Sequence, residues 1–150
     1  VRLFNRKLNE RTYHYPELLN ITTYCTANSV ILDGEVIALG DDGKPSFPTV
    51  MRRDGIRRFE KVNEVRKHVP ITYMVFDVIY YNGIWMNEQK LTDRMRRLKE
   101  IIVPSPFIQV VPSFTNSNEL FEVIKAQGME GIVIKNLNSP YFINGKNDRW

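Results

Sequence analysis

Apolar residues recur along the chain with two spacings, and these spacings predict its strands and helices. Strands with alternating or continuous apolar residues are predicted at 1–6, 30–39, 71–81, 107–112 and 130–135. Helices are predicted at 16–28, near 47–53, near 59–68, at 89–102 and at 117–127. The elements alternate, but the strands are short and several turns are typical of hairpins. This pattern favours a mixed α+β domain over a doubly wound parallel one.

The clearest strand, 71–81, ends at the turn pair Asn82-Gly83 and carries one carboxylate among apolar residues. Both of its faces are apolar apart from Thr72 and Asp77, which predicts a central strand covered on two sides. A carboxylate in that position needs a partner, either an arginine or a backbone N–H. Phe76 points away from Asp77, and a core role is the more usual one for phenylalanine in such a strand.

A second strand carries two carboxylates around a glycine, in the order Asp33-Gly34-Glu35. Alternation places Asp33 and Glu35 on one face, where they can hold a pair of sugar hydroxyls or a hard cation. Gly34 leaves room for a ligand beside the backbone. The alternative is a tight turn, because Asp-Gly is a common turn pair, and this segment alone slightly favours the turn.

The stretch 130–135 reads Glu-Gly-Ile-Val-Ile-Lys, an apolar strand between opposite charges. Glu130 could bind a divalent metal at the rim of a site, and Lys135 could reach a phosphate. A salt-bridged strand end explains the segment equally simply and is the better interpretation of it alone. Together, however, the three acidic strands predict a polar site within a sheet.

The net charge of +4 and the pI of about 9.2 are modest, but the basic residues are clustered. One cluster comprises Arg52, Arg53, Arg57, Arg58, Lys61, Arg66 and Lys67. The other comprises Arg94, Arg96, Arg97 and Lys99, on a predicted helix. Each cluster could contact phosphates or could simply be a solvated helix face.

Length and composition predict one soluble domain, or most of one. No apolar run approaches the roughly 20 residues that span a bilayer. Cys25 is the only cysteine, which excludes an internal disulfide and fits a reducing cytosol. One cysteine and two distant histidines supply no zinc set. The chain lacks an initiator Met, so we expect it to be part of a longer protein.

Five segments in order resemble the nucleotidyltransferase domain of ATP-dependent DNA ligases, particularly the small bacterial and end-joining type. They are Leu3 to Arg6 with Tyr15 to Leu18, Leu32 to Val36, Phe76-Asp77, Glu130 to Lys135, and Gly145-Lys146 up to Trp150. The resemblance covers nearly the whole chain. It implies an ATP-grasp-like α+β domain with mainly antiparallel sheets flanked by helices.

The resemblance also implies a role for each matching residue. Glu35 would contact the ribose or a metal, and Phe76 would stack on adenine. Glu130 would help to hold Mg²⁺ or Mn²⁺, and Lys135 would lie near the nucleotide phosphates. Arg6 would contact AMP or the 5′-phosphate at a nick.

The family reaction passes through lysyl-AMP and DNA-adenylate before a 3′-hydroxyl seals the nick. The implied partners are nicked or broken double-stranded DNA and end-joining proteins, and the implied setting is DNA repair or recombination in a bacterial or phage-infected cytoplasm.

The nucleophile motif of this family, Lys-x-Asp-Gly, is expected before residue 1, and no catalytic residue is assigned in this chain. Arg52 to Arg57 resembles that motif, but Arg52 stands where the nucleophilic lysine is required and cannot lose its proton. The 150-residue chain is therefore interpreted as the central part of an adenylation domain, with an OB-fold expected downstream. The alternatives are an RNA ligase, an mRNA capping enzyme, or a non-catalytic nucleic-acid-binding module of the same fold.

Overall fold

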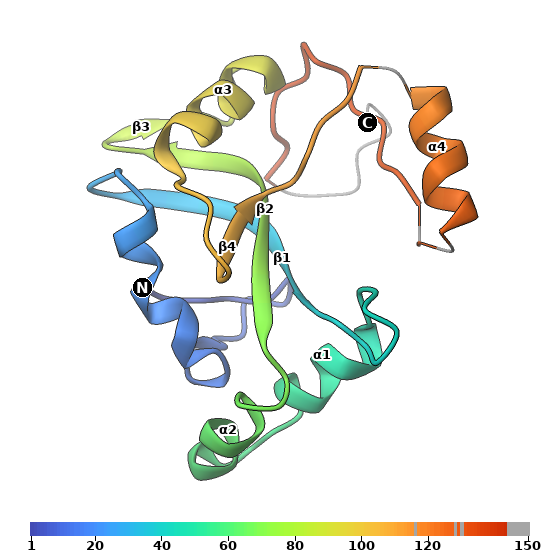
Figure 1. The fold of residues 1–150 in the computed structure, drawn as a ribbon. Helices are drawn as coiled ribbons and strands as arrows, with labels where there is room; N and C mark the ends of the chain where they lie inside the picture. Colours follow the sequence, from blue (N-terminus) through green and yellow to red (C-terminus); the bar gives the residue numbers. More distant parts are fainter. Residues whose placement is uncertain (116, 128, 130, 144–150) are drawn as a thin grey trace. The chain divides into compact units, whose positions relative to one another are not determined.

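The computed structural model describes residues 1–115, 117–127, 129 and 131–143 (Figure 1). Its strands are β1 (Val30–Ala38), β2 (Ile71–Tyr81), β3 (Ile84–Trp85) and β4 (Ile108–Val110). They form one sheet in the order β1-β2-β3, with β4 also paired to β2. The central position predicted for 71–81 is confirmed, because every other strand of this sheet pairs with β2. The predicted turn pair Asn82-Gly83, with φ of 45° and 93°, joins β2 to β3 in an antiparallel hairpin.

The chain combines helices with this sheet, so the predicted α+β class is confirmed. The helices are η1 (Thr12–His14), η2 (Pro16–Tyr24), α1 (Phe47–Asp54), α2 (Phe59–Val65), α3 (Leu91–Ile101) and α4 (Ser117–Ala126). α1 begins where the Ser46 hydroxyl accepts a hydrogen bond from the Thr49 N–H, which satisfies one free donor of its first turn. Among the described residues no helix is both long and apolar enough to cross a bilayer.

Two predictions near the N-terminus are wrong. Residues 1–6 form no strand, since the Asn5 side chain accepts hydrogen bonds from the N–H groups of Lys7 and Asn9 and folds the chain into a turn. The predicted helix 16–28 begins at Pro16 but forms as the 3₁₀ helix η2 and ends at Tyr24. Beyond it Cys25 pairs with Ile102 in an isolated bridge.

The strand predicted at 130–135 is also wrong over its described part. Residues 131–135 have no regular secondary structure, and Gly131 has a φ of 147°. Val133 and Ile134 are 73% and 66% exposed. Apolar residues form a strand only when another strand lies alongside, and the described part of the chain provides none here. Glu130 and the segment Gly145 to Trp150 lie outside the described residues.

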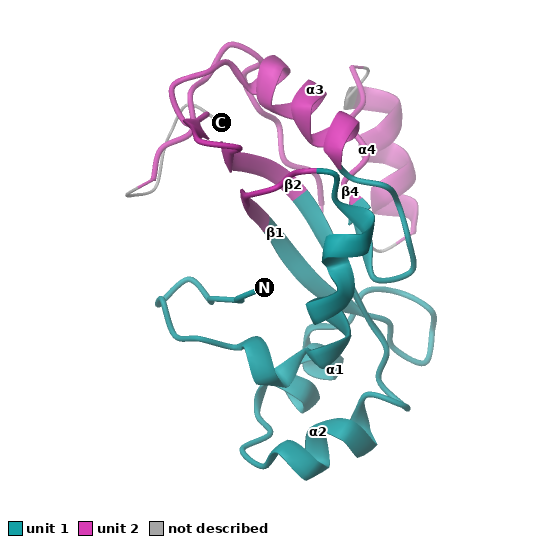
Figure 2. Cartoon of the chain, turned by 90° about the vertical axis from the view of Figure 1, so that its left-hand side faces the viewer, with its two compact units in different colours: residues 1–26, 34–75, 102–109 teal, residues 27–33, 76–101, 110–150 magenta. Residues whose placement is uncertain are grey.

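The structure divides into two compact units, each made of three segments (Figure 2). Unit 1 comprises residues 1–26, 34–75 and 102–109, and unit 2 comprises residues 27–33, 76–101 and 110–150. Each unit contains part of β1 and part of β2. The core of unit 1 includes Leu18, Val62, Val75 and Ile108, and the core of unit 2 includes Val78, Leu91, Leu98 and Ile101.

Candidate functional site

In unit 2, Phe76 of β2 and Lys135 lie together although 131–135 is not a strand. The Lys135 ammonium nitrogen is 4.8 Å from the centroid of the Phe76 ring. A cation over an aromatic face is stabilised by the ring quadrupole. Burial is the main cause that lowers the pKa of Lys135, and the nearby Asp77 and Asp33 carboxylates oppose this shift. The pair brings a flat apolar face next to a positive charge.

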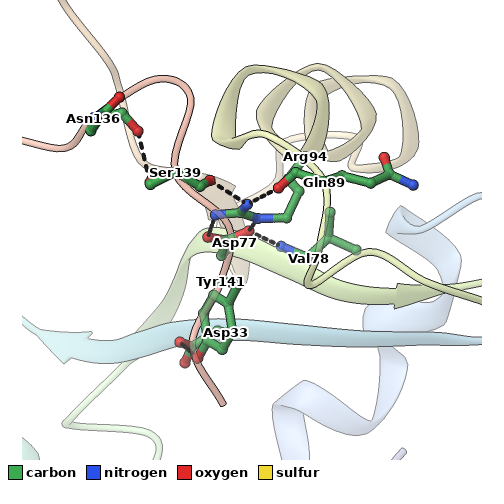
Figure 3. Close-up of polar contacts among 8 residues, drawn as sticks. All are labelled: Asp33, Asp77, Val78, Gln89, Arg94, Asn136, Ser139 and Tyr141. Atoms are coloured by element: carbon green, nitrogen blue, oxygen red, sulfur yellow. Dashed lines mark hydrogen bonds and ion pairs between the residues drawn. The ribbon is translucent and has the colours of Figure 1, made fainter. Parts of the chain in front are cut away.

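Asp77 has both of the partners considered for it from the sequence. Its carboxylate is 1% exposed and accepts two hydrogen bonds from the Arg94 guanidinium, Nε to Oδ1 at 2.7 Å and Nη2 to Oδ2 at 3.0 Å (Figure 3). The backbone N–H of Val78 donates a third, at 2.9 Å. A two-point arginine pair is the strongest geometry for a buried carboxylate. Asp77 is therefore held in place next to Phe76.

Arg94 also fixes the chain that follows Lys135. Its Nη1 donates to the carbonyl oxygens of Gln89 and Ser139, the second at 3.0 Å (Figure 3). The first turn of α3 adds two backbone bonds, from Leu91 N–H to Ser139 O and from Thr92 N–H to Leu137 O. N–H groups in a first helical turn have no partner within their own helix. The segment 137–139 supplies these partners and is thereby anchored to α3.

Asp33 of β1 is half-buried and is engaged by Tyr141. The Tyr141 hydroxyl donates a hydrogen bond to Asp33 Oδ2, and its ring lies 5.8 Å from the Arg94 guanidinium carbon (Figure 3). Burial and this hydrogen bond raise the pKa of the Tyr141 hydroxyl well above its ordinary value. The tyrosine therefore remains a hydrogen-bond donor throughout the physiological pH range.

The strand predicted at 30–39 is confirmed as β1, and the turn that Asp33-Gly34-Glu35 alone slightly favoured does not form, because β1 runs continuously through these residues. A Cβ on Gly34 would lie 2.5 Å from the Met74 carbonyl oxygen and 2.7 Å from the Tyr73 ring, both on β2. The space beside Gly34 thus accommodates the neighbouring strand rather than a ligand. Glu35 itself is exposed.

The remaining predicted site residues are not brought to Phe76 and Lys135 by described contacts. Arg6 is exposed in the N-terminal turn and belongs, like Glu35, to unit 1. Within the described ranges no three His, Cys, Asp or Glu side chains gather as a metal site. The metal role expected for Glu35 and Glu130 therefore stays a prediction.

Sequence reasoning missed Arg94 and Tyr141. A signal for Arg94 existed, because it occupies the buried stripe of α3 with Leu91, Leu98 and Ile101. A charged residue in an apolar stripe indicates a buried partner. Tyr141 gave no such signal, since 108 residues separate it from Asp33.

Unit 1 has a second buried polar cluster, centred on Arg53. Its guanidinium is fully buried and pairs with both Glu17 oxygens at 2.9 and 3.0 Å. It also donates to the carbonyl oxygens of Val69 and His14. Arg53, the neighbour of the arginine at the mimicked nucleophile position, is thus a structural residue of α1 that contacts η1, η2 and the segment just before β2.

Known proteins resemble this chain along its whole length. Residues 1–150 match the family model of the ATP dependent DNA ligase domain. The SPbeta prophage-derived DNA ligase-like protein LigB of Bacillus subtilis is 35% identical over 152 residues, which are 100% of this chain and 52% of LigB. A DNA ligase of Methanothrix thermoacetophila is 34% identical over 154 residues, which are 100% of this chain and 28% of that enzyme.

Among solved structures, mycobacterial DNA ligase D complexed with ATP and MES has the same fold. Its TM-score is 0.64 at 22% identity, over 94% of this chain and 43% of that one. The chain therefore spans about half the length of one relative and less than a third of the other. With the family model matched from end to end, the chain belongs to the family of ATP-dependent DNA ligase domains.

Proposed function

We propose that residues 1–150 are the central part of the adenylation domain of an ATP-dependent DNA ligase that seals nicks through lysyl-AMP and DNA-adenylate intermediates. The observation that carries this proposal is the position of the Lys135 ammonium over the Phe76 ring. A base needs a flat surface on which to stack, and its phosphates need a cation nearby. The family resemblance implied these two roles for these two residues, which are 59 positions apart.

Phe76 and Lys135 fit a bound adenine nucleotide. The ring is half-buried, so part of it remains accessible, and the buried surroundings of Lys135 strengthen its attraction for phosphate oxygens. ATP would supply the adenylyl group that activates the 5′-phosphate of DNA. A role for Mg²⁺ or Mn²⁺ at Glu35 and Glu130, and for Arg6 at AMP or the 5′-phosphate, belongs to the same proposal.

The network around Asp77 and Arg94 would keep this nucleotide site ordered. Asp77 adjoins Phe76 in β2, and Arg94 holds the segment that follows Lys135. If Phe76 and Lys135 could move apart, nucleotide binding would be weaker, because the nucleotide would have to order these two side chains. We therefore assign Asp77 and Arg94 positioning roles.

Intact mass after incubation with a nucleotide and Mg²⁺ tests the proposal. The longest natural chain that contains these residues is expected to gain one AMP from ATP and none of the corresponding mass from GTP. Lys135→Ala should reduce the amount of AMP adduct by on the order of tenfold or more, because it removes one charge-assisted contact to the phosphates. Lys125→Ala on the exposed side of α4 is the matched control and should leave the adduct unchanged.

Sealing assays then identify the acceptor. A nicked DNA duplex should be sealed, whereas a nicked RNA duplex should not. A GMP adduct would support a capping enzyme instead, and preferential sealing of RNA would support an RNA ligase. A folded protein that binds DNA but takes up no nucleotide would overturn the proposal in favour of a non-catalytic binding module.

A further inference from the structure

The two basic clusters of the sequence differ in whether their cations are paired with carboxylates. On α3, Arg94 is buried against Asp77, Arg96 pairs with Asp93 at 2.7 Å, and Arg97 pairs with Glu100 at 2.6 Å. Three of the four cations in this cluster therefore have a carboxylate partner within the protein. This cluster is largely neutralised.

The cluster along α1 and α2 is different. Arg53 is buried with Glu17, and the other six cations are exposed and have no ion pair in the part of the chain that the structure describes. We call these six the α1–α2 basic surface: Arg52, Arg57, Arg58, Lys61, Arg66 and Lys67. All six lie within a span of 16 consecutive positions, 52–67, in unit 1.

Nearby carboxylates do not compensate for this charge. Asp54 is engaged by the Tyr15 hydroxyl at 3.2 Å and by Arg11 at 3.6 Å, and both partners lie outside the basic surface. Glu60 and Glu64 are exposed and remain as the acidic residues of the segment. Unpaired like charges on neighbouring turns repel one another, so the arrangement costs stability unless a polyanion relieves the repulsion.

The dimensions of the surface suit a nucleic-acid backbone. α2 is about 10 Å long at 1.5 Å per residue, and the linker 55–58 adds at most about 13 Å. Duplex DNA presents about one negative charge per 1.7 Å of its axis, so this span faces several phosphates. Phe59, 51% exposed between Arg58 and Lys61, adds an apolar contact for sugars.

We propose that the α1–α2 basic surface binds the phosphate backbone of duplex DNA flanking the nick, independently of base sequence. The proposal rests on the ligase function proposed above and adds a DNA contact formed by residues outside the nucleotide site. Its binding energy comes from release of counterions, so its measurable signature is a dependence of affinity on salt.

The test compares two triple variants of the longest natural chain that contains these residues. One is Arg57→Ala/Arg58→Ala/Lys61→Ala, and the matched control removes three charges from α3 as Arg96→Ala/Arg97→Ala/Lys99→Ala. Binding to a nicked duplex and to the intact duplex is measured by fluorescence anisotropy from 50 to 200 mM KCl. The α1–α2 variant should bind both DNAs on the order of tenfold more weakly. Its log–log salt slope should be shallower by about 2–3, because each phosphate contact contributes about 0.9.

The control should keep the affinity and slope of the unmodified protein, and both variants should still take up AMP. Equal weakening by both variants, or an unchanged slope in the α1–α2 variant, would overturn the proposal. If that variant melts early, Arg66→Gln/Lys67→Gln, beyond the end of α2, provides the same comparison. Failure of the unmodified protein to take up AMP would contradict the ligase function alone, since the salt slopes would still decide the DNA contact.

Discussion

Two aromatic residues of β2 are covered by cations in the same way. The Lys135 nitrogen lies 4.8 Å from the Phe76 centroid, and the Arg97 guanidinium carbon lies 4.7 Å from the Tyr81 centroid. Only Phe76 is predicted to stack on a base. Phe76→Ala should weaken ATP binding by about 5- to 150-fold, because stacking contributes about 1–3 kcal/mol per base. Isothermal titration calorimetry measures this change.

Tyr81→Ala is the matched control, since it removes a ring from the same strand and leaves a cation without its aromatic partner. Its ATP affinity should stay within about twofold of the unmodified value. Equal losses of affinity in the two variants, accompanied by equal losses of stability, would make Phe76 a core residue.

Two adjacent arginines of α1 provide a second matched pair. Arg53 is fully buried with four hydrogen bonds, whereas Arg52 is exposed. Arg53→Met should lower the free energy of unfolding by about 3–5 kcal/mol, because Glu17 and two carbonyl oxygens lose their donor. Arg52→Met should change it by less than about 0.5 kcal/mol. Urea denaturation measures both, and comparable values would mean that the Arg53 network contributes little.

At the level of single residues, the sequence predicted that Asp77 has a buried partner but not which residue that partner is. A carboxylate in an apolar strand required a partner, and Asp77 has both an arginine and a backbone N–H. Its partner could not be chosen among many arginines, because Arg94 comes from another element 17 residues away. Hydrogen bonding at such separations depends on tertiary packing rather than on local pattern.

Among the elements, most helices and strands form close to where they were predicted, including the short α1, α2 and β4. The failures are the strands predicted at 1–6 and, over its described part, at 130–135. β2 and α3 form where expected, since apolar periodicity over eleven residues determines both. The 131–135 segment has the same apolar character but no paired neighbour in the described structure. A strand is stable only within a sheet, so its sequence alone could not settle its conformation.

The contact between β1 and β2 leads to a prediction about Gly34. A methyl group there would meet a backbone carbonyl at 2.5 Å, which cannot be relieved by a side-chain rotation. Gly34→Ala should therefore destabilise the protein by about 1–3 kcal/mol, as overpacking usually does. Thermal unfolding followed by circular dichroism measures the change.

Gly55→Ala serves as the control, because its added methyl group would lie 3.1 Å from the Met51 carbonyl oxygen, a milder contact, and Gly55 has ordinary helical backbone angles. We expect a markedly smaller loss of stability there. A larger loss for Gly55→Ala than for Gly34→Ala would contradict the tight approach of β1 to β2.

For the whole molecule, one buried histidine, His14, should make stability depend on pH near neutrality. His14 is buried and its pKa is lowered, mainly by burial, while His68 is exposed. As the pH falls below about 6.5, the unfolded chain takes up a proton at position 14 that the folded protein resists. Stability should therefore decrease between pH 7.5 and pH 5.5, since the unfolded state binds more protons.

Urea denaturation at several pH values measures this decrease. His14→Gln should flatten the profile over this window, and His68→Gln should leave it unchanged. A profile that remains equally steep in His14→Gln would assign the dependence to other groups.

The interleaving of the two units has a consequence for protein engineering. Unit 1 begins at residue 1 and ends at residue 109, and two of the three segments of unit 2 lie inside that interval. No continuous fragment of the gene therefore encodes one unit without much of the other. Domain exchange between ligases would have to move the interleaved segments together, and a reporter split at a unit boundary would cut through β1 or β2 or separate segments that pack together.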